Sequence, residues 1–349
     1  MNAPDRPGKG HPAHHLPDGR FANPPGSPVR QVGLKEAAAF FARQITKNRR
    51  PIMLPPDHSL GESEALAQWA ALEGHDGILW LGHASFLIRI AGVTFLTDPY
   101  LGLVAGPRNI GPRRYVAAAI HPRRLPHFDA IVLSHDHYDH LCEWTLGELA
   151  ERRHDIDIVC PLRLGQFFTK RGFSRVHELD WSDHTTIGGV EVTALPAIHF
   201  SGRGARDRNR TLWASFAFRG PLPDDGSGPG AHVYFSGDTG HGPVFRTIGM
   251  THGPFDLAVV GIGAYDPQTM MRPVHANPEE GLDIGRDVGA HVTLGMHWGT
   301  IVLTDEPVLE PAERFRKAAE ERGLGPDRAW LLKVGEARPL PRHWPSNSP

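Results

Sequence analysis

Hydrophobic residues occur in this chain mainly as short runs, separated by polar stretches that contain glycine or proline. Runs of about four to eight residues, enriched in Val, Ile, Leu and Phe, are typical of buried β-strands rather than of helices. They predict strands at residues 78–81, 86–90, 93–96, 130–133, 157–160, 191–195, 211–218, 231–236, 257–260 and 292–296.

Apolar positions at helical spacing fall in separate blocks between these runs, and this spacing predicts amphipathic helices. Helices are expected around residues 143–153, 162–171, 278–288 and 310–322. An earlier block predicts a helix before the first strand, through Leu34, Ala37, Ala38, Phe41 and Ile45. That helix either docks on the core or lies on a membrane surface, and the spacing leaves both alternatives open.

The order of these elements predicts an α+β protein in which helices pack on the outside of two sheets. Residues 1–31 are rich in Pro, Gly, Asn and His, and we expect a flexible or surface-hugging arm there. A helix and linker follow over 32–76, the main domain spans 77–338, and a tail covers 339–349. In the arm, His11, His14 and His15 could bind a metal adventitiously, but a solvated tail is the simpler interpretation.

Composition narrows the classes of function. The 37 basic and 39 acidic residues give a net charge of −2, so the whole chain shows no preference for nucleic acid. Two cysteines, Cys142 and Cys160, are too few for a disulfide framework. We see no secretory signal and no apolar run of about 18 residues, and we therefore expect a cytoplasmic protein, with peripheral membrane contact and a homodimer left open.

The segment from Ser134 to His140 carries the strongest chemical signal, because it contains an H-x-H-x-D-H pattern directly after an apolar run. His135, His137, Asp139 and His140 supply imidazole and carboxylate groups at the spacing that a pair of transition-metal ions needs. The chain has 22 histidines, yet chance would produce this pattern in only about one of a hundred such chains. The alternative is a solvated polar turn.

Three further apolar runs each lead to a residue that can bind metal, namely His199, Asp238 and His297. Strand ends at one edge of a sheet stack converge, so we expect these residues to lie beside the motif. His135, His137 and His199 would hold one metal ion, and Asp139, His140 and His297 the second, with Asp238 bridging them. Two such ions lower the pKa of bound water and polarise an electrophile.

Other residues are candidates for supporting roles. Asp98, at the end of an early strand, and His83 could orient the metal ligands through hydrogen bonds. Two loops are basic, and guanidinium groups in them suit phosphate or carboxylate recognition, although solvated loops are the alternative. The arginines are Arg203, Arg206, Arg208 and Arg210 in one loop and Arg108, Arg113, Arg114, Arg123 and Arg124 in the other.

With these motifs, the chain resembles the metallo-β-lactamase superfamily and, more narrowly, the N-acyl-phosphatidylethanolamine-hydrolysing phospholipase D family. The matching stretches include residues 80–84, 96–99, 134–141, 179–181, 237–240, 253–258, 262–265, 278–280 and 296–300. The Gly-Ala-Tyr, His-x-x-Pro-Glu-Glu and His-Trp-Gly-Thr segments are the most specific. The loops at 100–128 and 200–210 depart from the family pattern, and these loops would shape the substrate groove.

The resemblance implies a four-layer αββα sandwich and two zinc ions at the seven positions above. It also places His275 near the site as a proton donor or substrate contact. Tyr265, together with Arg203 and Arg206 of the basic loop, is a candidate substrate-binding residue. Asp139, Asp238 and His275 are then the candidate catalytic residues. Nitrogen and oxygen ligands suit zinc, and manganese or iron also fits.

We therefore expect a dizinc phosphodiesterase that cleaves an anionic substrate, most simply an N-acyl phosphatidylethanolamine-like phospholipid. A sugar-phosphate lactonase, or another metal-dependent hydrolase of C–O bonds, is the alternative enzyme, because its metal site would be similar and the basic loops could hold its phosphate. An inactive metal-binding module is the alternative without catalysis, and the presence of all seven ligand types argues against it.

Overall fold

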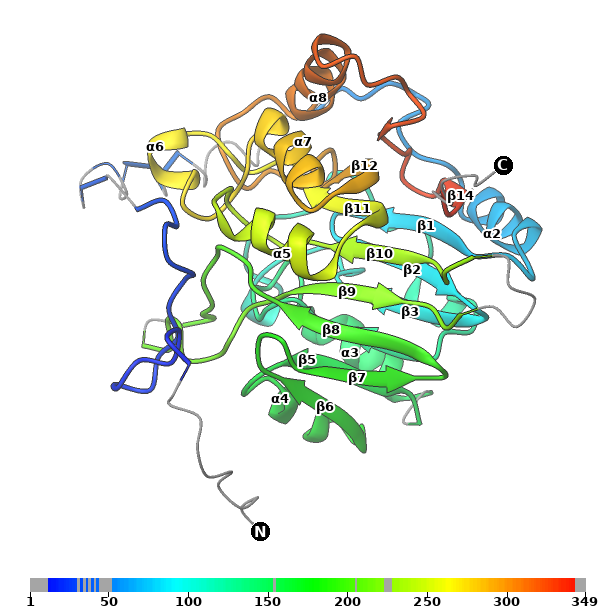
Figure 1. Ribbon diagram of the computed structural model, residues 1–349, viewed down its shortest axis with the longest axis horizontal. Coiled ribbons are helices and arrows are strands. Elements are labelled where there is room, and N and C mark those ends of the chain that lie inside the picture. The colour runs from blue at the N-terminus through cyan, green and yellow to red at the C-terminus, as the bar shows by residue number, and fades with distance from the viewer. Residues whose placement is uncertain are drawn as a thin grey trace.

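The computed structural model describes residues 12–29, 32–33, 36, 39–40, 42–43, 52–152, 155–204, 206–222 and 228–342. Over these residues, two mixed seven-stranded sheets form the centre of the molecule and helices lie outside them (Figure 1). The expected α+β class and the αββα sandwich are confirmed.

The first sheet has the strand order β14-β1-β2-β3-β4-β5-β6. The bounds are β1 (Gly77–Gly82), β2 (Ser85–Ile90), β3 (Val93–Thr97), β4 (Ala130–Val132), β5 (Asp157–Pro161), β6 (Arg175–Leu179) and β14 (Ala337–Pro339). β1, β2 and β3 pair antiparallel, whereas β3 to β6 are parallel and need crossovers. These crossovers contain η1 (Pro107–Asn109), η2 (Pro122–Arg124), α3 (Glu143–Ala150) and α4 (Gly165–Thr169).

The second sheet has the order β13-β12-β11-β10-β9-β8-β7. Its strands are β7 (His184–Ile187), β8 (Val190–Leu195), β9 (Ser215–Arg219), β10 (His232–Phe235), β11 (Phe255–Gly261), β12 (Ala290–Met296) and β13 (Ala329–Trp330). β10 to β13 are parallel, and their crossovers carry α5 (Val244–His252), α6 (Gln268–Met271), α7 (Pro278–Asp287) and α8 (Glu310–Glu321). In Figure 1, α5 and α7 lie in front of this sheet.

Side chains of the central strands alternate between two faces, and this alternation builds the layers of the sandwich. In β11, Leu257 and Val259 join the large apolar core that both sheets share, while Ala258 and Val260 face the smaller cluster that includes residues of α5 and α7. Successive side chains of a strand point to opposite faces, so one strand fills two layers. Across the shared core, the rings of Phe95 in β3 and Phe218 in β9 lie 5.1 Å apart.

Several elements differ from the prediction. The strand expected at 211–218 begins only at Ser215, and β6 and β7 carry too many exposed polar residues to form an apolar run. α2 (Glu62–Ala71) lies in the region expected as a linker, and α5 has no predicted counterpart. The expected helix from Leu34 falls largely on residues outside the described ranges. No helix in the described part of the chain is long and apolar enough to span a bilayer.

Candidate metal centre

The seven expected ligands meet where strands of both sheets end. His135, His137, Asp139 and His140 follow β4 of the first sheet. His199, Asp238 and His297 follow β8, β10 and β12 of the second sheet. The side chains form groups whose ligand atoms lie close enough to surround metal ions. The site therefore lies across the junction between the two sheets.

The first group consists of three imidazoles. Nδ1 of His137 lies 2.8 Å from Nε2 of His135 and 3.1 Å from Nε2 of His199. Burial lowers the pKa of all three rings, to well below the usual value for His135 and His199. Neutral imidazoles with converging nitrogens are the form of histidine that binds a metal ion.

The second group adds carboxylates. Nε2 of His297 lies 3.5 Å from Oδ2 of Asp139, and Nε2 of His140 lies 3.7 Å from the same oxygen. Asp238 contacts both groups: its Oδ2 is 3.1 Å from Nε2 of His140 and 3.8 Å from Nε2 of His199, and its Oδ1 is 3.2 Å from Nε2 of His297. Asp238 therefore occupies the position between the two groups.

The hydrogen bonding of these buried atoms fits a pair of cations. Nε2 of His140, Oδ1 of Asp238 and both ring nitrogens of His297 are buried, yet none has a hydrogen-bond partner among the described residues. Leaving buried polar atoms unpaired costs about 1–3 kcal/mol each. A metal ion would satisfy the Nε2 and Oδ1 atoms without a proton between them.

The carboxylates also determine the charge of the second group. Burial alone would lower the pKa of His297, but Asp238 and Asp139 outweigh it and raise this pKa to about 9. In the same way, burial opposes the charged form of Asp238, but His140 and His297 hold its pKa well below the usual range. The pocket thus concentrates negative charge that cations on imidazole, or metal ions in their place, must balance.

Asp98 supports the motif from behind. Its Oδ2 accepts hydrogen bonds from Nδ1 of His140 at 2.7 Å and from the Ser134 hydroxyl at 2.6 Å, and its Oδ1 accepts from the Ser134 backbone at 2.7 Å. Asp98 is completely buried. The Ser134 hydroxyl also lies 2.8 Å from Nδ1 of His135. The structure therefore places Asp98 where it can orient His140.

His83 contacts a carboxylate rather than an imidazole. Its Nε2 lies 3.0 Å from Oδ2 of Asp139, and its Nδ1 lies 3.2 Å from the Thr300 hydroxyl. Burial, together with the neighbouring His297, lowers the pKa of His83 to about 3. A neutral ring can donate only one of these hydrogen bonds, and donation to Asp139 would fix that carboxylate.

His275 borders the centre. Its ring centroid is 5.2 Å from that of His199 and 5.4 Å from that of His297, and its Nδ1 lies 3.8 Å from Oδ2 of Asp238. Burial lowers its pKa to about 4, so the ring is uncharged at neutral pH. Its side chain keeps 15% of its surface exposed, which leaves it accessible from outside.

The expected substrate-binding residues occupy different environments. Arg203 donates from Nη1 to the carbonyls of Asp136 and Leu141, at 2.6 and 2.9 Å, and its side chain is only 7% exposed. Tyr265 is buried, and its hydroxyl donates to Glu310 of α8 at 2.6 Å. Arg206 is exposed. Arg203 and Tyr265 are thus engaged within the protein, whereas Arg206 faces solvent.

Several residues that contact the expected ligands were not among the candidates predicted from the sequence. Ser134 and Thr300 lie next to motif residues, and their hydroxyls were a usable signal. The carbonyl of Val274 accepts a hydrogen bond from Nδ1 of His199 at 2.8 Å, which no side-chain pattern reveals. Phe200 packs its ring 4.4 Å from that of His137, and Arg208, one of the arginines of the basic loop, stacks on Phe200 at 4.2 Å. Asn23, in the N-terminal arm, contacts His199.

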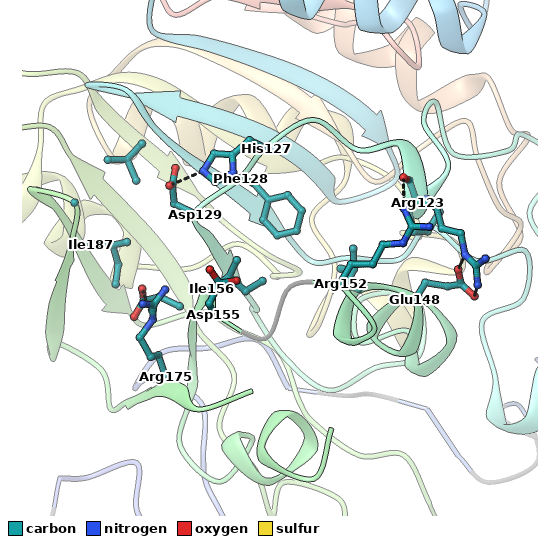
Figure 2. A pocket seen from close by; sticks show the side chains of 15 residues that line it. Arg123, His127, Phe128, Asp129, Glu148, Arg152, Asp155, Ile156, Arg175 and Ile187 are labelled. Atoms are coloured by element: carbon teal, nitrogen blue, oxygen red, sulfur yellow. Dashed lines mark hydrogen bonds and ion pairs between the residues drawn. The ribbon is translucent and has the colours of Figure 1, made fainter. Parts of the chain in front are cut away.

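A second concentration of charge lies at the opposite strand ends, in a cavity of about 550 Å³ (Figure 2). Asp157 and Arg175 start β5 and β6, and Asp129 immediately precedes β4. These charges are paired: His127 lies 2.9 Å from Asp129, Arg175 lies 3.2 Å from Asp157, and Arg123 pairs with Glu148. Because it lies at the opposite ends of the strands, this cavity is separate from the candidate metal centre.

Several known proteins are similar to this chain in sequence. A family model described as a β-lactamase superfamily domain matches residues 94–298. An uncharacterised protein of Mycobacterium tuberculosis is 40% identical over 249 residues, which cover 70% of this chain and 64% of that protein. The N-acyl-phosphatidylethanolamine-hydrolyzing phospholipase D 1 of Caenorhabditis elegans is 36% identical over 255 residues, covering 70% of this chain and 69% of the relative.

Among solved structures, an isothiocyanate hydrolase from Delia radicum gut bacteria has the same fold. It superposes with a TM-score of 0.59 at 18% sequence identity and covers 76% of this chain and 100% of its own. The present chain spans less than two thirds of the mycobacterial relative, at 64% of its length. The family match and the shared fold lead to one assignment: the chain belongs to the metallo-β-lactamase superfamily of metal-dependent hydrolases.

Proposed function

We propose that the chain is a dinuclear zinc hydrolase that cleaves a phosphodiester, with an N-acyl phosphatidylethanolamine-like lipid as substrate. The observation that carries the metal part is the position of Asp238 between two groups of ligands, with an Oδ1 that accepts no hydrogen bond from the residues that the structure describes. His135, His137 and His199 would hold one ion, and Asp139, His140 and His297 the other. Asp238 would contribute to both.

The donor set suits zinc, because imidazole nitrogen and carboxylate oxygen are its usual ligands in catalytic sites. When bound, a pair of such ions activates water and stabilises the negative charge that develops on the substrate. The side chains and carbonyls around the ligands would fix the position of the reaction. Asp98, hydrogen-bonded to His140 at 2.7 Å, and the Val274 carbonyl, 2.8 Å from Nδ1 of His199, would keep the ligand rings in place.

The similarity to the nematode phospholipase D supports a phosphodiester as substrate. In such a reaction water adds to phosphorus, the bond from phosphorus to the ethanolamine oxygen breaks, and that oxygen takes up a proton. His275 lies at the border of the centre, where its uncharged ring can hydrogen-bond the substrate. Of the two arginines expected to bind substrate, Arg203 and Arg206, only Arg206 is exposed and accessible to an anionic group.

An apolar cavity of about 800 Å³ supports a lipid substrate. Cys142 lines it, only two residues after His140, together with Leu101, Val104, Val116 and Trp144. Cavities of this kind bury the hydrocarbon part of a ligand. At this face, Leu103 is 55% exposed and Trp144 is 40% exposed, and nearby Ile110 is 74% exposed. These side chains would let the mouth of the cavity contact a membrane surface peripherally.

The test combines metal analysis with a substrate panel. The purified protein would be stripped with a chelator, reloaded with zinc, manganese or iron, and assayed on bis-p-nitrophenyl phosphate and on phosphatidylcholine vesicles that contain N-acyl phosphatidylethanolamine. We expect two ions per chain and release of N-acylethanolamine from the vesicles only after reloading.

Two variants and a second substrate class make this test specific. His135→Ala and Asp238→Ala should each bind fewer than two ions. Retention of both ions would refute the ligand assignment. A panel of lactones, including sugar-phosphate lactones, is assayed in parallel. Two bound ions with lactone turnover and no phosphodiester turnover would refute the proposed substrate class while leaving the metal centre intact.

A further inference from the structure

The N-terminal arm contacts a metal ligand directly. Oδ1 of Asn23 accepts a hydrogen bond from the backbone N–H of His199 at 2.9 Å. The same oxygen accepts from Nε1 of Trp213 at 3.1 Å, and that indole N–H also donates to the carbonyl of Ala197 at 2.9 Å. One side-chain oxygen of the arm therefore joins the segment that carries His199 to the segment that leads into β9.

His199 needs such support, because it lies four residues beyond the end of β8 and outside the sheet ladder. Its ring is held at Nδ1 by the Val274 carbonyl, and its backbone is held by Asn23. The orientation of a side chain depends on both its backbone and its ring contacts. The carbonyl of Val274 fixes the ring of His199 but not its backbone.

Two anchors keep Asn23 in this position. Phe21 is 1% exposed and packs with Ala197, Leu212 and Trp213, and its backbone N–H donates to the carbonyl of Asn209 at 2.8 Å. Farther along the arm, Nε2 of His14 lies 2.7 Å from Oδ1 of Asp180, and Nε2 of His15 lies 2.8 Å from Oδ2. The His14 ring also stacks on Trp181 at 4.1 Å.

The cluster of His14, His15 and Asp180 has the composition of a metal site, but its contacts favour a hydrogen-bonded clasp. Each imidazole faces its own carboxylate oxygen at a hydrogen-bond distance, so two N–H donors satisfy Asp180. In the metal centre, by contrast, ring nitrogens face one another, and several buried atoms lack a hydrogen-bond partner in the part of the chain that the structure describes. Charge-assisted hydrogen bonds of this type are stronger than neutral ones.

We propose that the arm is a structural part of the metal centre, with Asn23 as a positioning residue for His199 and His14, His15 and Asp180 as the clasp that keeps it docked. This inference rests on metal ligation by His199 in the proposed function. The arm lies outside residues 94–298, which the family model covers, whereas His199, Trp213 and Asp180 lie within them.

The test compares Asn23→Ala with Asn23→Asp. Zinc content is measured in buffers of graded free zinc, and the visible spectrum of the cobalt-substituted protein reports ligand geometry. Asn23→Ala should bind one of its two ions about 10–100-fold more weakly, the usual loss when a group that orients a ligand is removed. Asn23→Asp retains an oxygen that accepts both hydrogen bonds, and should keep the affinity and the spectrum close to wild type.

Releasing the clasp provides a second route to the same result. His14→Ala/His15→Ala leaves Asn23 and the centre unchanged in sequence, and should weaken the same ion in the same direction. Asp18→Asn, in an exposed part of the same arm, is the matched control and should behave as wild type. Thermal unfolding of each variant shows whether the domain stays folded.

The outcomes separate the two proposals. Two tightly bound ions and an unchanged cobalt spectrum in Asn23→Ala would overturn the positioning role while leaving the metal centre intact. A wild-type protein that binds no ion would instead show that the proposed centre itself fails. A third ion in the wild type that the His14→Ala/His15→Ala protein lacks would overturn the clasp and make the cluster a metal site.

Discussion

Asp98 and His140 form a buried hydrogen bond in which Oδ2 and Nδ1 are 2.7 Å apart. We expect Asp98→Asn to weaken zinc binding by about 10–100-fold, because an amide whose oxygen faces His140 and the Ser134 hydroxyl turns its NH2 group toward the Ser134 backbone N–H, whose hydrogen bond Oδ1 of the carboxylate now accepts. Titration with a chromophoric zinc chelator measures this loss. Asp57→Asn removes a carboxylate that is 70% exposed and should leave the affinity unchanged. Equal affinities in the two variants would exclude the orienting role of Asp98.

Gly237, next to Asp238, should not tolerate a side chain. Its φ is +54°, and an added Cβ would lie 2.6 Å from Cβ of Ser134, which hydrogen-bonds Asp98. Gly237→Ala should therefore cost about 2–4 kcal/mol of stability from backbone strain and overpacking together, and should weaken metal binding. Chemical denaturation measures the first effect and zinc titration the second.

Gly323→Ala is the matched control for this substitution. Gly323 has a similar φ of +67°, and nothing lies within 4 Å of an added Cβ. Only the backbone strain of about 1 kcal/mol should appear there, with no effect on metal affinity. A loss of stability as large as that of Gly237→Ala would show that the contact with Ser134 is irrelevant.

Arg203 should act as a brace for the ligand loop and not as a substrate contact. Its guanidinium donates to the carbonyls of Asp136 and Leu141 and lies 3.7 Å from the centre of the Tyr138 ring. Arg203→Lys loses the planar fork, and should lower the free energy of unfolding by about 1–3 kcal/mol and lower kcat. Exposed Arg206→Lys should leave stability unchanged. A raised KM with unchanged stability in Arg203→Lys would instead indicate that Arg203 binds substrate.

His232 should make stability depend on pH. Burial, with the nearby Arg219, lowers its pKa from 6.5 to about 4, and its Nδ1 lies 2.9 Å from the carbonyl of Pro254. The unfolded chain therefore takes up a proton at a higher pH than the folded protein does. The stability that the neutral His232 ring contributes to the folded state is complete above pH 6.5 and is lost as the pH falls toward 4.

His232→Asn removes this titration and can retain a donor to the Pro254 carbonyl. Between pH 7 and pH 5, the chelator-treated wild type should lose about 1–2 kcal/mol more stability than the variant. Urea unfolding at both pH values measures the difference, and chelation removes any effect of pH on bound metal. Parallel stability profiles for the two proteins would contradict the lowered pKa of His232.

The apolar runs predicted the central strands well, because a buried strand needs continuous hydrophobic residues whatever its neighbours are. The strand β7 lies at the edge of its sheet and has the burial of a surface element, so its sequence shows no such run. The site profits from the same regularity of the central strands. The seven ligand types follow predicted strands, and their convergence could be anticipated from that placement.

Residues that act through tertiary contacts could not be anticipated in this way. Arg203 was predicted from its charge to bind an anion, and the carbonyls that accept its hydrogen bonds are not visible in the sequence. Asn23 is separated by 176 residues from His199, and nothing local in the arm indicates the partner. Phe21, a large apolar residue in a polar arm, was the one local sign that this segment docks.

The division of the ligands between the sheets has a consequence for assembly. His135, His137, Asp139 and His140 come from the first sheet, and His199, Asp238 and His297 come from the second. Neither half of the sandwich carries the complete set of ligands proposed for either ion. Binding of the two proposed ions would therefore require that the two halves pack together correctly. Each bound ion would then stabilise the association of the two sheets. A chain in which one half is misfolded would bind fewer ions and would be inactive. Correct assembly of the sandwich and activity would thus depend on the same seven side chains.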